Sequence, residues 1–197
     1  MRTLIIIPVL LFSLFLGASS YSADFNKGLT AAQSGDFATA LKEWKPLAGQ
    51  GDADAQTNLG LMYQNGWGVP QDDKEAVYWY KLAAEQGDAK AQYNLGVMYD
   101  VGDGVPQDYK EAARLWILAA EQGHANAQYN LGQMYDVGEG VPLDKVYAYM
   151  WFNIVAANGD KDAEEERKKL NKTLSQSQVQ EAQRLTRECV KKNYKGC

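Results

Sequence analysis

The chain is poor in the side chains that most enzymes use for catalysis. Among its 197 residues it has one histidine and two cysteines. No serine is followed three positions later by a lysine, the arrangement that activates the nucleophile of serine β-lactamases. The zinc-binding His-Glu-x-x-His, the P-loop and the dinucleotide glycine fingerprint are also missing. His124 has no fixed base or nucleophile beside it in the sequence, so we expect a surface residue. The sequence therefore predicts a protein that is not an enzyme and holds no cofactor.

Basic side chains are scarce in the main body of the chain. Residues 21–159 carry 9 Lys and Arg against 18 Asp and Glu, whereas residues 160–197 carry 10 and 7. Nucleic acids need a basic face, so this balance disfavours a nucleic-acid partner. The acids of the loops, such as Asp100 and Glu139, lack the EF-hand spacing. We expect solvated loops and no metal site.

A long apolar run is missing after residue 16. At the start of the chain, Arg2 precedes an apolar run of 13 residues, Leu4 to Leu16, and small residues follow that run. This pattern predicts a signal peptide of residues 1–22, with cleavage after Ser20, Ser22 or Ala23. The run is shorter than the roughly 20 residues that span a bilayer, so we expect an exported protein without a stable membrane anchor.

Cysteine is confined to the C-terminal end of the chain, at Cys189 and Cys197. In an exported protein an isolated pair favours a disulfide, which here closes a short loop. A reactive or intermolecular pair of thiols is the alternative.

A block of nine residues recurs with a period of 36. The segment 55–63 returns at 91–99 and again at 127–135, with Ala, Gln, Asn, Leu, Gly, Met and Tyr at the same places. A fixed period of this length predicts a stacked array of helical units.

Each unit has the pattern of two helices. Ala55, Leu59, Met62 and Tyr63 share one helical face, and glycines with Pro70 then end the helix. A second helix is expected from about residue 72 to Gly87 and its equivalents. The predicted divisions are an N-terminal capping pair at 23–52, repeats at 53–88, 89–124 and 125–159, and C-terminal capping helices at 160–197. The fold class is therefore all-α, an α-solenoid of stacked antiparallel helix pairs.

A glycine lies inside the first helix of each repeat, at Gly60, Gly96 and Gly132. Glycine costs up to about 1 kcal/mol there relative to alanine, so three copies predict a close helix crossing. Further on, Ser175 and Gln178 have the spacing of a capping box that starts the last helix.

Most positions expected on the inner, concave face differ between repeats, while the framework positions and an asparagine at the edge of that face are constant. The residues expected on the concave face are Thr57, Asn58, Leu61, Gln64, Lys90, Tyr93, Asn94, Val97, Asp100, Asn126, Tyr129, Asn130, Gln133 and Asp136. The repeated asparagines would bond a peptide backbone, or else neighbouring helices. The tyrosines would anchor a partner, or else pack one repeat on the next. A partner with basic and apolar side chains suits this surface.

The repeat resembles the Sel1-like repeat, a relative of the tetratricopeptide repeat. In one copy the matching residues are Ala91, Leu95, Gly96, Tyr99, Gly102, Gly104, Val105, Asp108, Ala112, Ala119, Ala120 and Gly123. The resemblance implies a right-handed superhelix that binds a protein or peptide on its concave side, in a periplasm or outside the cell.

Some cysteine-rich members of that family bind or slowly hydrolyse penicillin-type ligands, which gives an alternative function. Those members carry cysteine pairs within their repeats, whereas these repeats have none. A purely structural spacer is a third hypothesis.

Overall fold

The computed structural model describes residues 23–197, so the predicted signal peptide of residues 1–22 lies outside the described part. Within residues 23–197 the chain forms ten α-helices and no β-strand. The helices are α1 (Phe25–Gln33), α2 (Phe37–Gly49), α3 (Ala53–Asn65), α4 (Asp73–Glu85), α5 (Ala89–Val101), α6 (Tyr109–Ala120), α7 (Ala125–Val137), α8 (Lys145–Ala157), α9 (Lys161–Asn171) and α10 (Gln176–Lys191).

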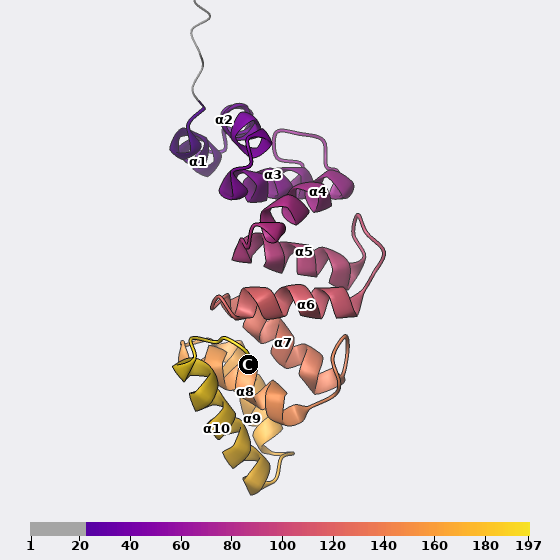
Figure 1. Ribbon diagram of the computed structural model, residues 1–197, viewed down its shortest axis with the longest axis vertical. Coiled ribbons are helices and arrows are strands. Elements are labelled where there is room, and N and C mark those ends of the chain that lie inside the picture. The colour runs from indigo at the N-terminus through magenta and orange to yellow at the C-terminus, as the bar shows by residue number, and fades with distance from the viewer. Residues whose placement is uncertain (1–22) are drawn as a thin grey trace, which may run out of the picture.

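The helices stack in chain order into an elongated array (Figure 1). Each helix from α1 to α8 packs on its neighbour in sequence, and α8 is covered by both α9 and α10. This is the all-α solenoid of stacked helix pairs that the 36-residue period predicts.

Aspartates set the starts of most helices. In eight of the ten helices between residues 23 and 197, an aspartate side chain accepts a hydrogen bond from a free backbone N–H group of the first turn. Each such cap contributes about 1 kcal/mol. The remaining two helices begin at His124 and at Ser175, and the predicted capping box of Ser175 with Gln178 is confirmed.

The repeated glycines each face an aromatic ring of the second helix in the same pair. A Cβ added at these glycines would come within 3.0 Å of ring atoms. The pairs are Gly28 with Trp44, Gly60 with Tyr80, Gly96 with Trp116, and Gly132 with Phe152. The predicted close helix crossing is confirmed, because the absent side chain is the space that the ring fills.

A ladder of buried glutamines joins successive repeats. Gln56, Gln92 and Gln128 have at most 4% of their surface exposed, and each Nε2 donates to a carbonyl of the preceding second helix. Gln86 and Gln122 then donate to Oε1 of the first two, at 2.7 and 2.9 Å. Because buried amides must be satisfied, this ladder fixes how one repeat sits on the next.

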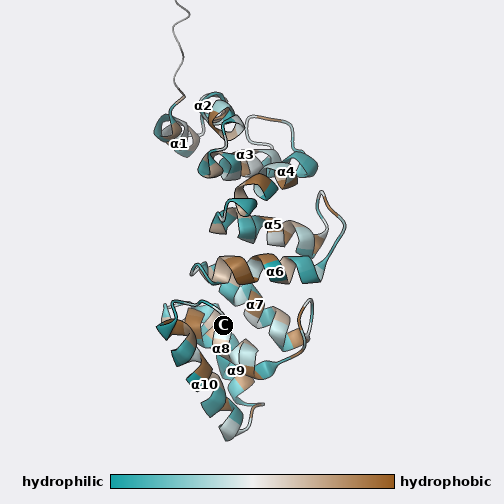
Figure 2. Cartoon of the chain, viewed as in Figure 1, coloured by the Kyte–Doolittle hydropathy of each residue, from teal (hydrophilic) through white to brown (hydrophobic). Residues whose placement is uncertain are grey.

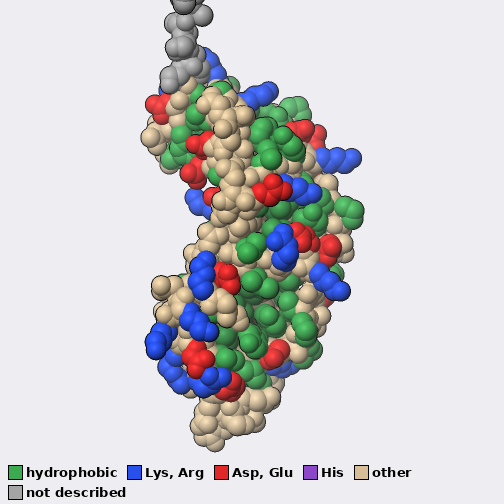
Figure 3. All heavy atoms as spheres, in the orientation of Figure 1, with side chains coloured by type: hydrophobic (Ala, Val, Ile, Leu, Met, Phe, Trp, Pro, Cys, Tyr) green, Lys and Arg blue, Asp and Glu red, His purple; other side chains and the backbone are tan. Residues whose placement is uncertain are grey.

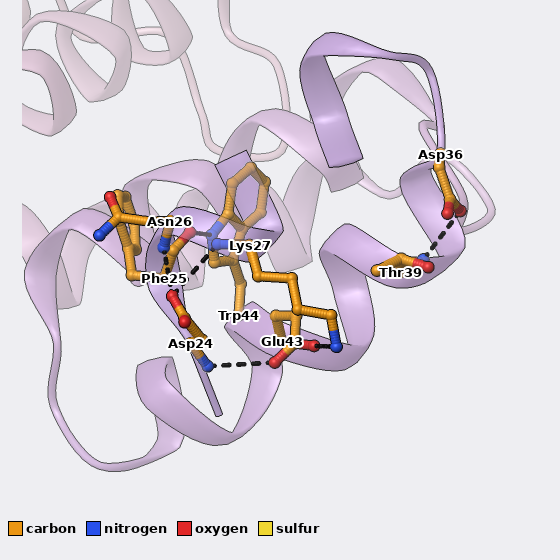
Figure 4. Close-up of polar contacts among 8 residues, drawn as sticks. All are labelled: Asp24, Phe25, Asn26, Lys27, Asp36, Thr39, Glu43 and Trp44. Atoms are coloured by element: carbon orange, nitrogen blue, oxygen red, sulfur yellow. Dashed lines mark hydrogen bonds and ion pairs between the residues drawn. The ribbon is translucent and has the colours of Figure 1, made fainter. Parts of the chain in front are cut away.

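The N-terminal helix pair contains a buried carboxylate (Figure 4). Glu43 is fully buried and accepts from the backbone N–H of Asp24 at 3.0 Å and from Lys27 Nζ at 2.5 Å. The neighbouring Trp44 donates from Nε1 to the Phe25 carbonyl at 3.2 Å. These bonds hold α1 against α2 and so close this end of the core.

The C-terminal helices close the other end. The aromatic residues of α8, among them Tyr149 and Phe152, pack with Leu170 of α9 and Ala182 of α10. Figure 2 shows α10 with both hydrophobic and hydrophilic residues, as its one-sided contact with α8 requires. In Figure 3, Lys and Arg side chains gather over this end of the molecule.

The predicted disulfide is confirmed. Cys189 and Cys197 are bonded, with Cα atoms 5.4 Å apart. The bond folds the tail back, so that the Gly196 N–H donates to Glu121 Oε1 at 2.8 Å and Tyr194 packs beside Gly123. The tail therefore docks on the turn between α6 and α7.

Candidate functional site: the inner groove

The first helices of the three repeats, α3, α5 and α7, carry the residues predicted for the inner face. Thirteen of the fourteen are at least partly exposed in the structure. Lys90 and Asn126 are exposed in the first turns of α5 and α7, and Val97 is half-buried in the middle of α5. We call this face of the stack, with the two pockets described below, the inner groove.

Thr57 differs from the expectation. Only 3% of its surface is exposed, and its hydroxyl donates to Asp88 Oδ1 at 3.0 Å. The same oxygen accepts from the Ala91 N–H and caps α5. Thr57 therefore joins the first repeat to the cap of the second and is not available to a partner.

In the middle of the groove, two predicted residues bond within the chain. The Tyr80 hydroxyl donates to Gln64 Oε1 at 2.7 Å, and Gln64 Nε2 lies 3.4 Å from Met98 Sδ. Burial raises the pKa of Tyr80 well above its usual value, opposed by a hydrogen bond from the Asn94 side chain. Gln64 and Asn94 thus connect the first and second repeats, as the alternative interpretation of the asparagines requires. Asn58, by contrast, donates to a carbonyl of its own helix at 2.8 Å.

The two predicted tyrosine anchors take part in packing between helices. Tyr93 stacks on His124 with ring centroids 4.6 Å apart, and its carbonyl accepts from Trp116 Nε1 at 3.1 Å. The rings of Tyr129 and Phe152 pack edge to face, with centroids 5.4 Å apart. Both are half-buried. Part of each ring is therefore committed to the core, and the remainder lies at the groove.

His124 also differs from the expectation of a simple surface residue. It is half-buried and takes the N-cap position that aspartate fills in the other repeats, with Nδ1 accepting from the Ala127 N–H at 3.4 Å. Burial lowers its pKa, while the charge of Asp88 opposes that shift. The sequence held the signal, since His124 aligns with Asp88, but the cap itself appears only in three dimensions.

At one end of the inner groove lies an apolar pocket of about 220 Å³, which we call the N-terminal pocket. Its apolar lining comes from α1, α2, α3 and the loop after α3. The larger of these side chains are Leu29, Phe37, Trp44, Leu61, Met62 and Trp67. Trp67 stacks on Phe37 with centroids 5.3 Å apart, and both Trp67 and Leu29 stay substantially exposed, at 42% and 38%. The predicted residues Asn58 and Leu61 meet here.

Between α5 and α7 lies a pocket of about 230 Å³, which we call the acidic pocket. It is lined by Asp100, Trp116, Asn130, Gln133, Met134, Val137 and Glu139. Burial and the charge of Glu139 raise the pKa of Asp100 above its usual value. The nearby predicted residue Asp136 instead lies 3.6 Å from Lys145 Nζ. Three predicted residues, Asp100, Asn130 and Gln133, meet in this pocket, while Glu139 was not among the residues predicted for the groove.

No helix within residues 23–197 is both long and apolar enough to cross a membrane. Over the same range, no three His, Cys, Asp or Glu side chains come together as metal ligands would.

Comparisons with known proteins identify the repeats. The family model described as Sel1 repeat matches residues 53–88, 89–124 and 125–160. A Sel1 repeat protein from Oxalobacter formigenes has a similar structure, with a TM-score of 0.73 and 28% identity over 84% of this chain and 75% of that one.

A second similar structure is c5321, a protective antigen present in uropathogenic Escherichia coli strains that displays an SLR fold. It has a TM-score of 0.54 and 30% identity over 86% of this chain, which spans 45% of c5321. No curated protein matches the chain. Because the three matched repeats cover more than half of the sequence, the chain belongs to the Sel1 repeat family.

Proposed function

We propose that this protein is an exported, non-catalytic scaffold that binds an extended segment of another protein in its inner groove. Sel1 repeat proteins are generally non-catalytic scaffolds, and their fold is suited to protein–protein interaction. A solenoid offers a long surface along which a partner contacts several repeats in turn.

The observation that carries the proposal is the contrast between framework and groove. Framework residues such as the buried glutamines are identical in all three repeats. Apart from the recurring asparagines, groove positions differ, since Leu61, Val97 and Gln133 occupy the same place in successive repeats. A spacer would need only the framework, whereas a binding surface needs different chemistry along its length.

Export rests on two features. One is the signal-peptide pattern of residues 1–22, and the other is the Cys189–Cys197 disulfide, which is typical of oxidising compartments. A periplasmic or secreted location is consistent with both.

Affinity capture from the native compartment tests the proposal. The bait would be the wild type, Val97→Arg in the middle of the groove, and Gln133→Arg at an exposed groove position. Tyr78→Arg is the matched control, because Tyr78 is 52% exposed on α4, a second helix of the stack.

We expect a protein that is retained by the wild type and by Tyr78→Arg, and lost from both groove variants. Thermal melting of each bait establishes that the loss is not unfolding. A partner retained equally by all four baits would contradict binding in the groove.

A further inference from the structure

The N-terminal pocket and the acidic pocket are equivalent sites, two repeats apart. Five lining positions of one recur in the other at a separation of 72 residues, twice the 36-residue period. The pairs are Trp44 with Trp116, Asn58 with Asn130, Leu61 with Gln133, Met62 with Met134, and Trp67 with Glu139. The same side of a first helix, that of α3 in one case and α7 in the other, therefore lines both pockets.

The chemistry of the two pockets is nevertheless opposite. The tryptophan, the asparagine and the methionine are the same in both pockets. The acidic pocket has Gln133 where the N-terminal pocket has Leu61, and Glu139 where it has Trp67. Asp100 adds a second carboxylate to the wall of the acidic pocket. Equivalent lining positions that carry different side chains indicate two sites that select different side chains of a partner.

The N-terminal pocket is suited to one large apolar side chain. Its volume of about 220 Å³ is below the roughly 300–1,000 Å³ typical of small-molecule sites. Its walls are almost entirely aromatic and aliphatic, and Gln33 and Asn58 are the polar exceptions. A leucine or aromatic side chain of a partner would remove Trp67 and Leu29 from water.

The acidic pocket is suited to a cation. Asp100 and Glu139 line the same small cavity, where their like charges repel; burial first, and the charge of Glu139 second, raise the pKa of Asp100. A lysine or arginine side chain placed between them would relieve that repulsion, and Asn130 and Gln133 offer amide oxygens for its remaining N–H groups.

We propose that the partner segment places one bulky apolar side chain in the N-terminal pocket and one lysine or arginine side chain in the acidic pocket. This inference rests on the proposed function and names the chemistry of the partner. The two pockets are separated by two repeat steps, each of roughly 10 Å or more given the usual distance between packed helices. An extended chain advances about 3.3 Å per residue, so the two side chains lie at least about six residues apart.

A random 12-residue peptide library displayed on phage provides the test. Selection on the wild-type chain, followed by titration of synthetic copies of the enriched peptides, should give sequences with a bulky apolar residue and a Lys or Arg at least about six positions apart. Asp100→Asn/Glu139→Gln should bind these peptides about 3- to 10-fold more weakly and lose the preference for the basic residue.

Trp67→Glu, which copies the acidic pocket into the N-terminal one, should weaken binding about 10-fold or more. Glu85→Gln/Glu165→Gln removes two exposed carboxylates elsewhere and serves as the charge-matched control. Its affinity for the same peptides should equal that of the wild type.

The outcomes separate the inference from the proposed function. Peptides that bind in the groove, as judged by loss with Val97→Arg, a residue that lines neither pocket, but ignore both pocket variants would overturn the two-pocket inference alone. Enriched peptides without the apolar and basic pair would do the same. Failure to select any peptide that depends on the groove would overturn both.

Discussion

The close crossing at Gly96 gives a quantitative test of the framework. In Gly96→Ala the new Cβ would lie within 3.0 Å of the Trp116 indole, whose Nε1 donates to the Tyr93 carbonyl. Trp116 is 3% exposed, so the ring has little room to move. Overpacking of a core costs about 1–3 kcal/mol, and a strained hydrogen bond adds up to about 1 kcal/mol. The gain from replacing a helical glycine, about 0.5–1 kcal/mol, offsets part of that loss.

We therefore expect Gly96→Ala to lower the free energy of unfolding by about 1–3 kcal/mol, with a larger loss for Gly96→Val. For a chain of this length that corresponds to a fall in the melting temperature of roughly 2–12 °C. Circular dichroism during heating and urea unfolding measures both quantities.

Gly49→Ala is the matched control, because Gly49 is also helical but has no atom within 4 Å of an added Cβ. It should be neutral or stabilising by up to about 1 kcal/mol. A double-mutant cycle with Trp116→Leu should recover part of the loss in Gly96→Ala, since the smaller side chain frees the space. If Gly96→Ala were as stable as Gly49→Ala, the packing argument would be refuted.

Four further predictions concern other parts of the molecule. His124 binds a proton less readily when folded, so stability should fall as the pH drops below about 6.5; pH-dependent melting of His124→Asp, which keeps the cap, should lack that decline. Reduction of the Cys189–Cys197 bond should cost about 2–3 kcal/mol in urea unfolding, and two free thiols by mass analysis of the exported protein would contradict the bridge. Gln92→Leu removes two hydrogen bonds, one to the Ala84 carbonyl and one from the Gln122 amide, and should cost about 1–3 kcal/mol, whereas exposed Gln183→Leu should not. A penicillin ester should not be turned over, and measurable hydrolysis would favour the alternative function.

The fold was predictable because the same residues recur at the same positions in three successive repeats. Glycine at Gly60, Gly96 and Gly132 costs helix stability at each place, so its recurrence had to reflect a tertiary contact. The sequence could not say which ring fills the space, because that depends on the register between the two helices of a pair. Tyr80, Trp116 and Phe152 fill that space, and hydrogen bonds to Gln64 and to the Tyr93 carbonyl also hold the first two.

The groove was predictable in outline and less so in detail. Helical periodicity places Thr57 and Leu61 on one face, yet the next repeat covers Thr57 and leaves Leu61 half-buried. The spacing of residues within one helix carries no information about which part of that helix the following helix pair packs against. The pockets were missed for the same reason, since Trp67 and Glu139 belong to loops whose path brings them beside the groove.

Site-specific photo-crosslinking tests the central claim, that the inner groove binds a segment of another protein. A photoreactive residue at position 97 lies in the middle of the groove, and one at position 78 lies at an exposed site on α4. We predict that the probe at 97 captures one protein in the native compartment, within a single segment carrying apolar and basic residues, and that the probe at 78 does not. Crosslinks from 78 alone, or equal crosslinks from both positions, would contradict the account.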